Sequence, residues 1–343
     1  MKKNVLDFTF EELEGYITQK LEMKKFRATQ IADWIYKKHI YEFDNMKNIS
    51  KDDRYLLNEN LYIGIPEIKA VQESKIDGTT KFLFELEDGS TVESVILFYP
   101  NRVSACISTQ VGCALKCKFC STGASGFVRD MTAGEIVSQI LAMEEVKNIN
   151  INNIVYMGMG EPFLNYDNVI KSIKILNDKK MKCLGGRHIT VSTSGIVEKI
   201  EELGDLPIEV RLSVSLHAPN NEIRDKIMPI NNKYPIEQVI QGCKDYQEKT
   251  NKRVTMEYIM IRGLNDSEEN ARELAKLIQD LKVMVNLIPV NPNPAGYERP
   301  SKKFIDQFAK ILIENGIDVT IRAEKGTDID AACGQLRRRN EKK

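Results

Sequence analysis

Three cysteines lie within eight residues of one another, at Cys113, Cys117 and Cys120. Three thiolates on one short loop can bind three irons of a [4Fe-4S] cube and leave the fourth iron open. An open iron suits a cluster that binds a substrate, since clusters that only transfer electrons normally have four protein ligands. Structural zinc would need a fourth ligand, usually from a second cysteine pair. No second CxxC occurs, which leaves His217 or a distant cysteine to complete a zinc site.

Glycine and polar residues follow several apolar stretches that we expect to be strands. The segment GMGEP at 158–162 offers glycines, which permit close backbone approach, and a carboxylate that can accept from an amine. The candidate cofactor-binding positions at these strand ends are Gly160, Glu161, Ser192, Ser215, Leu216, His217 and Asn291. Ser192 also precedes an expected helix, so it could serve only as a helix cap.

The elements that must position these residues alternate regularly from about residue 103 onward. Strand and helix patterns alternate six times, with expected strands at 103–109, 153–158, 188–193, 210–216, 253–261 and 283–290, and a last strand at 318–322. The helices are expected to begin near Thr132, Asn165, Gly195, Pro235, Ser267 and Ser301. Strands separated by such helices form right-handed parallel βαβ units. Six units are too few for a closed eight-fold barrel, so the pattern predicts an α/β fold, either a partial (βα)6 barrel or a doubly wound sheet. Active groups should then lie at the C-terminal ends of the strands.

The first part of the chain has a different pattern. Thr9 and Glu12 fit a capping box that opens an amphipathic helix, a second helix contains Trp34, and Ser50 can begin a third. A hairpin pattern follows, with its turn at Asp88-Gly89. We therefore expect a small α-rich accessory domain at 1–95 and the barrel at 96–343.

Composition narrows the class of protein only moderately. The 343 residues contain 49 Lys+Arg and 49 Asp+Glu, so a polyanionic partner would have to meet a local basic surface. Two stretches are locally basic, 20–39 and 337–343. No apolar run approaches the ~18 residues that span a bilayer, and the N-terminus does not read as a signal peptide. We expect a cytoplasmic protein without structural disulfides and without membrane contact.

The cysteine spacing, with Phe119 before the third cysteine, resembles the radical S-adenosylmethionine (SAM) superfamily. The resemblance implies that the open iron of one [4Fe-4S] cluster chelates SAM, and that one electron cleaves the sulfonium to release a 5'-deoxyadenosyl radical. The electron would come from a donor such as flavodoxin or ferredoxin. GMGEP resembles the superfamily's SAM-amine motif, in which Glu161 accepts from the SAM amino group.

A narrower resemblance covers about residues 75–337, and the helical N-terminal unit more loosely. The strings QVGCALKCKFCSTG, GMGEPFLNYDNV, STSG, SLHAPN, MPIN, NLIPVNP and DIDAACGQL are similar to the RlmN branch of the RlmN/Cfr methyltransferases. Phe163 and Asp130-Met131 depart from that pattern, at positions where no chemistry is expected. The resemblance implies methylation of C2 of an adenosine in 23S rRNA and of an adenosine beside the anticodon in some tRNAs.

The same resemblance assigns chemistry to three residues outside the cluster. Adenine C2 has no nucleophilic lone pair, so polar methyl transfer from SAM fails, whereas a carbon radical can add to it. Cys333 would carry the methyl group and, after hydrogen abstraction, tether the protein to the RNA. Cys106 would resolve the adduct by forming a disulfide with Cys333. Glu93 would remove the C2 proton as a general base.

Other interpretations remain open from the sequence. A Cfr-type enzyme would methylate C8 with the same machinery, although GEP and NLIPVNP favour the RlmN branch. A non-catalytic RNA-binding protein with a structural iron–sulfur cluster is a different class. Without the resemblance a lone cysteine is more often a small core residue, and we interpret Cys183 and Cys243 in that way. Trp34 is expected in the core, although it and Tyr36 lie in a basic stretch that could grip RNA. We expect a monomer.

Overall fold

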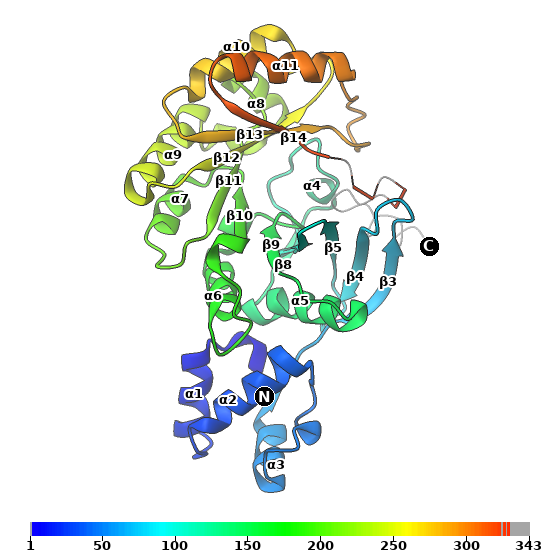
Figure 1. Ribbon diagram of the computed structural model, residues 1–343, viewed down its shortest axis with the longest axis vertical. Coiled ribbons are helices and arrows are strands. Elements are labelled where there is room, and N and C mark those ends of the chain that lie inside the picture. Colours follow the sequence, from blue (N-terminus) through cyan, green and yellow to red (C-terminus); the bar gives the residue numbers. More distant parts are fainter. Residues whose placement is uncertain (1, 324, 327, 330–343) are drawn as a thin grey trace.

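The computed structural model describes residues 2–323, 325–326 and 328–329 of the chain. Its centre is one ten-stranded sheet in the order β14-β13-β12-β11-β10-β9-β6-β5-β4-β3 (Figure 1). The parallel strands are β6 (Arg102–Cys106), β9 (Asn153–Tyr156), β10 (Ile189–Thr193), β11 (Arg211–Ser215), β12 (Val254–Met260), β13 (Val283–Pro289) and β14 (Asp318–Ile321). Each of these parallel strands lies beside the one that follows it in this series, as is usual for consecutive βαβ units.

The helices between these strands begin where the sequence predicts. They are α5 (Ala133–Lys147), α6 (Tyr166–Asn177), α7 (Val197–Gly204), α9 (Ile236–Thr250), α10 (Glu268–Ile278) and α11 (Lys302–Glu314). Thr132 and Glu135 form the predicted capping box of α5, which satisfies backbone N–H groups that the helix itself leaves without acceptors. The prediction of a partial barrel with an α-rich N-terminal part is confirmed.

Three antiparallel strands extend the barrel sheet before residue 100. β3 (Glu67–Glu73), β4 (Thr80–Glu85) and β5 (Thr91–Tyr99) form a meander, and β5 pairs with β6 from Val95↔Cys106 to Tyr99↔Arg102. The sheet therefore runs without interruption past residue 95, where the sequence pattern suggested a division. We propose that the accessory unit ends near residue 64, ahead of β3.

The accessory unit is a small helical layer at one end of the molecule (Figure 1). It contains β1 (Lys3–Asn4), α1 (Phe10–Gln19), α2 (Phe26–Lys38), α3 (Lys51–Asn60) and β2 (Leu61–Tyr62). The predicted capping box of Thr9 and Glu12 is present at α1. Trp34 is only partly buried against the core, and its indole N–H donates to Asn48 at 2.5 Å. Tyr36 is buried, so its ring is not on the basic surface.

Helix α5 is covered on all sides over most of its length, up to Glu144. Most of its residues from Ala133 to Glu144 are buried, because the sheet packs on one side of it and the accessory unit on the other. Polar groups of α5 have partners on both sides: the Gln139 side chain accepts from Ser94 Oγ at 2.6 Å, and the backbone N–H of Gly134 donates to Asp7 of the accessory unit at 2.7 Å. The accessory unit and the barrel consequently share one hydrophobic core.

Four short elements near the cysteines are absent from the sequence prediction. They are β7 (Gln110–Gly112), β8 (Phe127–Asp130), α4 (Ser121–Ser125) and α8 (Asn221–Ile227). β7 and β8 form a two-stranded ribbon that holds the cysteine loop at both of its ends. No helix in the described part of the chain is long and apolar enough to span a bilayer.

Candidate active site

The cysteine loop lies over the C-terminal ends of the parallel strands. It is anchored at its start by a close backbone crossing, since a Cβ on Gly112 would lie 1.9 Å from Gly126 O and Gly112 has φ +80°. Cys113 N donates to Gly126 O at 2.9 Å. Further along, Lys118 N donates to Ile227 O at 3.0 Å, and Cys117 and Phe119 pack against a small apolar cluster that contains Ile227, Met228, Ile259, Ile261 and Val290. The loop is thereby fixed to the ribbon on one side and to the barrel rim on the other.

Two of the three thiols of this loop, Cys113 and Cys117, would need a nearby cation to ionise at neutral pH. Burial raises the pKa of Cys113 to about 12, with the charges of Cys120 and Glu161 adding to the rise. Burial also raises the pKa of Cys117, again with help from Cys120, Cys113 and Glu161. Among the described residues, no three His, Cys, Asp or Glu side chains converge closely enough to hold a single metal ion. Thiolates that each bind a different iron of a cube need not converge on one point, so the loop fits a cluster better than zinc.

Glu161 connects the GMGEP segment to its neighbours on both sides. Its backbone N–H donates to Gln110 Oε1 at 2.8 Å, and its carboxylate accepts from the N–H groups of Phe163 at 3.1 Å and Ser194 at 2.8 Å. Burial raises the pKa of Glu161, and these hydrogen bonds oppose the rise. The carboxylate has further lone pairs, so it can also accept from an ammonium group of a ligand.

The glycines of GMGEP have a packing role. A Cβ on Gly158 would meet the carbonyl of Ile107 at 2.6 Å, and a Cβ on Gly160 would lie 2.6 Å from that of Gln110. Gly160 also has φ +101°, which side-chain-bearing residues rarely adopt. These glycines are therefore needed for strand ends β6 and β9 to approach one another, whether or not a ligand also approaches them.

His217 lies at the end of β11 beneath the cysteine loop. Its ring stacks edge-on against Phe119 with centroids 4.9 Å apart, and its Nδ1 accepts from Ile259 N at 3.0 Å. Burial, together with the nearby charge of Arg224, lowers the pKa of His217 to about 3. The ring is therefore neutral, and with Nδ1 accepting, Nε2 carries the proton and can donate.

Serines and an acid form a polar layer inside the barrel. Ser192 is buried and in register with Ser213, whose hydroxyl donates to Glu257 Oε1 at 2.8 Å. Asn286 donates to the other carboxylate oxygen of Glu257 at 2.7 Å. Ser192 thus lies inside the barrel, below the C-terminal ends of the strands, whereas Ser215 and Leu216 lie at those ends. Asn291 follows β13 and is exposed, with Oδ1 accepting from Arg299 at 3.4 Å.

Arg224 is a fully buried cation that the sequence pattern did not single out. It lies on α8, and its guanidinium donates to five acceptors, namely the carbonyls of Ser194, Ser215, Leu216 and Tyr234 and the amide oxygen of Asn231. Burial lowers the pKa of Arg224 to about 10, so it remains charged at neutral pH. One planar group thereby fixes the C-terminal ends of β10 and β11 relative to each other.

Arg224→Met is expected to reduce the free energy of unfolding by roughly 3 kcal/mol or more, because several buried carbonyls would lose their donor. The free energy of unfolding of Arg224→Lys should fall between those of Arg224→Met and the unmodified protein, since three N–H donors cannot serve five acceptors. Denaturant unfolding measures this change. Arg253→Met is the matched control, because Arg253 is exposed. Equal unfolding midpoints for Arg224→Met and the unmodified protein would contradict the assignment.

Glu93 and Cys106 lie on the same face of the sheet. Cys106 is in register with Val95, two residues from Glu93, and alternate residues of a strand share a face. Ser94 points to the opposite face, where it contacts Gln139 of α5. Glu93 and Cys106 therefore face the barrel interior, and both are buried.

Backbone contacts fix Glu93 beside the rim. Glu93 N donates to Met159 Sδ at 3.4 Å, and Glu93 O accepts from Ser108 Oγ at 2.5 Å. Burial raises the pKa of Cys106 to about 11, and the charge of Arg322 opposes that rise. Cys333 lies outside the described residues. Cys243 is buried as predicted, but Cys183 is exposed, so its interpretation as a core residue is wrong.

Comparisons with known proteins agree with this geometry. Residues 107–275 match the family model described as "Radical SAM superfamily", and residues 3–63 match "Ribosomal RNA large subunit methyltransferase N-terminal domain". The crystal structure of a radical SAM methyltransferase from Sphaerobacter thermophilus is 42% identical, with a TM-score of 0.93 over 97% of this chain and 98% of that one. The fold and the site define a radical SAM enzyme, a class that uses SAM and an iron–sulfur cluster.

Full-length relatives specify the family. The "Probable dual-specificity RNA methyltransferase RlmN" of Petrotoga mobilis is 63% identical over 98% of this chain and 97% of its own length. The protein of the same name from Fervidobacterium nodosum is 57% identical over 99% of this chain and 98% of its own. The chain belongs to the RlmN family of radical SAM RNA methyltransferases.

Proposed function

We propose that this enzyme methylates C2 of an adenosine in 23S rRNA and of an adenosine beside the anticodon in some tRNAs. The observation that carries the proposal is the placement of Glu93 and Cys106 on one buried inner face, next to the rim that holds the cysteine loop and Glu161. A base and a thiol at this position suit a reaction that removes a ring proton and resolves a covalent adduct.

Cys113, Cys117 and Cys120 would hold one [4Fe-4S] cluster, and no fourth protein ligand is proposed. The cluster and SAM, when bound, supply a 5'-deoxyadenosyl radical. Glu161 would accept from the SAM amino group, and the neutral His217 would offer its Nε2–H from the rim. Gly160, Ser192, Ser215, Leu216 and Asn291 complete the proposed SAM-binding set.

The remaining steps belong to the protein's own side chains. Cys333 would accept a methyl group on sulfur. Removal of one hydrogen atom from that group, as 5'-deoxyadenosine forms, would leave a carbon radical that bonds to adenine C2. Glu93 would then take the C2 proton as one electron returns to the cluster. Cys106 would attack the sulfur of Cys333, so that the S–S bond forms, the S–C bond breaks, and the methyl carbon takes up a proton and leaves with the RNA. The high pKa of buried Cys106 would need lowering for that attack, and Arg322 supplies a charge of the right sign.

Glu93→Gln is expected to slow RNA methylation by about 10²- to 10⁴-fold, the usual range for a positioned acid–base group. The amide keeps the shape of the side chain but cannot take the proton. Methylation of Cys333 and formation of 5'-deoxyadenosine should continue, because neither step needs that proton transfer. Single-turnover assays of all three products measure this. Loss of all three would show that Glu93 supports the fold or cofactor binding instead, and loss of none would show that it has no role in the reaction.

The position of the new methyl group distinguishes the two members of the wider family. A Cfr-type enzyme would yield 8-methyladenosine, whereas the proposal requires 2-methyladenosine. Mass spectrometry of nucleosides from rRNA and tRNA treated with enzyme, SAM and a reductant separates them. Detection of 8-methyladenosine alone would contradict the proposal.

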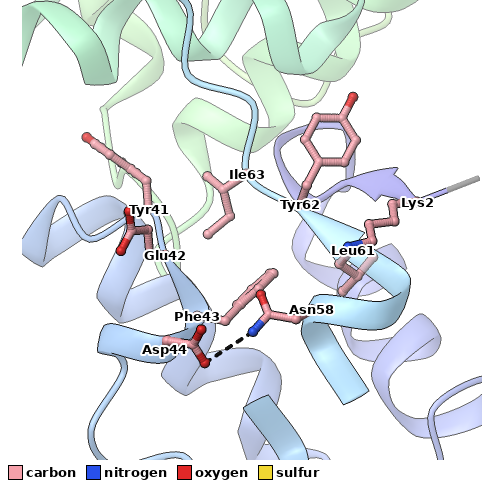
Figure 2. A pocket seen from close by; sticks show the side chains of 9 residues that line it. All are labelled: Lys2, Tyr41, Glu42, Phe43, Asp44, Asn58, Leu61, Tyr62 and Ile63. Carbon is pink, nitrogen blue, oxygen red and sulfur yellow. Dashed lines mark hydrogen bonds between the residues drawn. The ribbon is translucent and has the colours of Figure 1, made fainter. Parts of the chain in front are cut away.

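RNA would reach the site only with the target base removed from its stack. We place the RNA backbone along the basic α2 helix, where Lys38 lies 3.6 Å from the centroid of the Trp34 ring. A pocket of about 270 Å³ lies on the same unit (Figure 2), but two acids, Glu42 and Asp44, line it against one lysine, Lys2, so it suits phosphates poorly. We further propose a cytoplasmic monomer that receives electrons from flavodoxin or ferredoxin.

A further inference from the structure

The chain beyond β14 crosses from one edge of the sheet to the other. β14 and β3 are the two edge strands of this incomplete barrel. Arg322 N still donates to Leu287 O of β13 at 2.9 Å, but Gly326 N donates to Asp77 Oδ2, at the turn between β3 and β4, at 3.1 Å. Figure 1 shows this red segment passing from β14 to that turn. We refer to the described residues between 322 and 329 as the strap.

The shortest contacts of the strap are made by one carboxylate. Asp328 accepts from Ser74 Oγ at 2.6 Å and from Lys75 N at 2.9 Å. Ser74 is buried, and its hydroxyl oxygen also accepts from the N–H groups of Ile76 and Asp77, which leaves its proton directed at Asp328. The hydrogen bond from Ser74 lowers the pKa of Asp328, so the carboxylate is charged at neutral pH.

The receiving turn is organised independently of the strap. Ser74 N donates to Thr79 O at 2.8 Å, Gly78 N donates to Ser74 O at 3.1 Å, and Thr79 N donates to Asp77 Oδ1 at 3.0 Å. Lys325 adds a second attachment, with Nζ 4.0 Å from Asp77 and 5.1 Å from the centroid of the Tyr99 ring. The strap therefore packs on a turn that is already ordered by its own hydrogen bonds. Asp328 makes the shortest contacts between the strap and this turn.

Cys333 follows Asp328 by only five residues, whereas it follows the end of β14 by twelve. A chain of five residues reaches at most about 18 Å, and one of twelve residues about 43 Å. Fastening Asp328 therefore reduces the largest possible distance between Cys333 and its point of attachment more than two-fold. Because the effective concentration of a tethered group falls roughly as the −3/2 power of the tether length, shortening the tether from twelve residues to five raises the effective concentration of the Cys333 thiol by about four-fold.

We propose that Asp328 is a positioning residue that fastens the strap to Ser74 and thereby keeps Cys333 within reach of its reaction partners. This inference rests on the proposed function, in which Cys333 must meet SAM, the adenine and Cys106 in turn. In that proposal Cys333 meets all three partners at the barrel. The five-residue separation from Asp328 therefore keeps the thiol close to the site of each reaction.

The test compares the unmodified full-length enzyme with Asp328→Ala, Asp328→Asn and Asp318→Ala, each loaded with its cluster. Asp318 is the matched control, because it is an acid near the same end of the chain whose partner is the exposed Arg253. Methylation of Cys333 is followed by peptide mass spectrometry under single-turnover conditions, and 5'-deoxyadenosine formation without RNA reports the cluster and SAM site. Limited trypsin cleavage after Lys325, measured on protein without cofactors, reports release of the strap.

In Asp328→Ala the strap keeps only the longer contacts of Gly326 and Lys325 with Asp77. We expect the loss of the Asp328 contacts to release the strap, which should slow Cys333 methylation by about four-fold, in proportion to the lost effective concentration, and accelerate cleavage after Lys325. Asp328→Asn should be intermediate, since it has only one acceptor oxygen. Formation of 5'-deoxyadenosine should match that of the unmodified enzyme, and Asp318→Ala should change none of the three. Methylation of Cys333 at an unchanged rate in Asp328→Ala would overturn the positioning role alone. Absence of methyl-Cys333 from the unmodified enzyme would overturn the proposed function and this inference with it.

Discussion

Cys117→Ala is expected to abolish the iron–sulfur chromophore and SAM cleavage together. With only two thiolates left on the loop, one more iron would lose its protein ligand, and a cube so held would not persist. Cys113→Ala and Cys120→Ala should have the same effect, because each of the three thiolates would bind a different iron of the cube. Iron and sulfide content, the visible absorption spectrum and 5'-deoxyadenosine yield after anaerobic reconstitution measure the outcome.

Cys183→Ala and Cys243→Ala are the matched controls for this experiment. Cys183 is exposed and Cys243 is buried, and neither is in the cysteine loop, so both variants should retain the full chromophore. The fold should survive in Cys117→Ala, since the loop is also held by Lys118, Cys113 and the β7–β8 ribbon through backbone hydrogen bonds. A Cys117→Ala protein that retains a complete cube would refute the three-ligand assignment.

Cys106→Ala is expected to halt the reaction at the covalent protein–RNA species. Its side chain faces the barrel interior beside Glu93, where it would attack the sulfur of Cys333. Without that thiol the adduct forms but is not released, so multiple turnover should fall to background. A slowly migrating band on a denaturing gel, sensitive to ribonuclease, reports the adduct.

The double variant Cys106→Ala with Cys333→Ala tests the carrier in the same gel. It should show no adduct, because no sulfur remains to link the RNA. Normal turnover of Cys106→Ala would mean that adduct resolution does not use this thiol. An adduct in the double variant would mean that another residue carries the methyl group.

The order of strands and helices from residue 103 could be predicted from the sequence because each element has a local signal. Thr132 with Glu135 and Ser267 before α10 mark helix starts through capping, and the buried strands are continuous apolar runs. Parallel order then follows from connection geometry. The positions of Glu161 and His217 at the rim follow from that order as well.

Contacts between distant segments could not be predicted in the same way. The ribbon of β7 and β8 is short and rests on one close crossing of Gly112 and Gly126, which has no periodic signal. In the sequence, Arg224 cannot be distinguished from an ordinary exposed arginine. Only the structure shows that five acceptors from separate segments surround its guanidinium. The hairpin at Asp88-Gly89 was recognisable, but only strand pairing shows that β5 continues into the barrel sheet.

Helix α5 has a consequence for how the protein loses its structure. Since α5 is covered by the sheet on one side and by the accessory unit on the other, removing the accessory unit would expose a face built for the interior. Because the two parts share one hydrophobic core, heat should melt the accessory helices together with the part of the barrel that packs on α5.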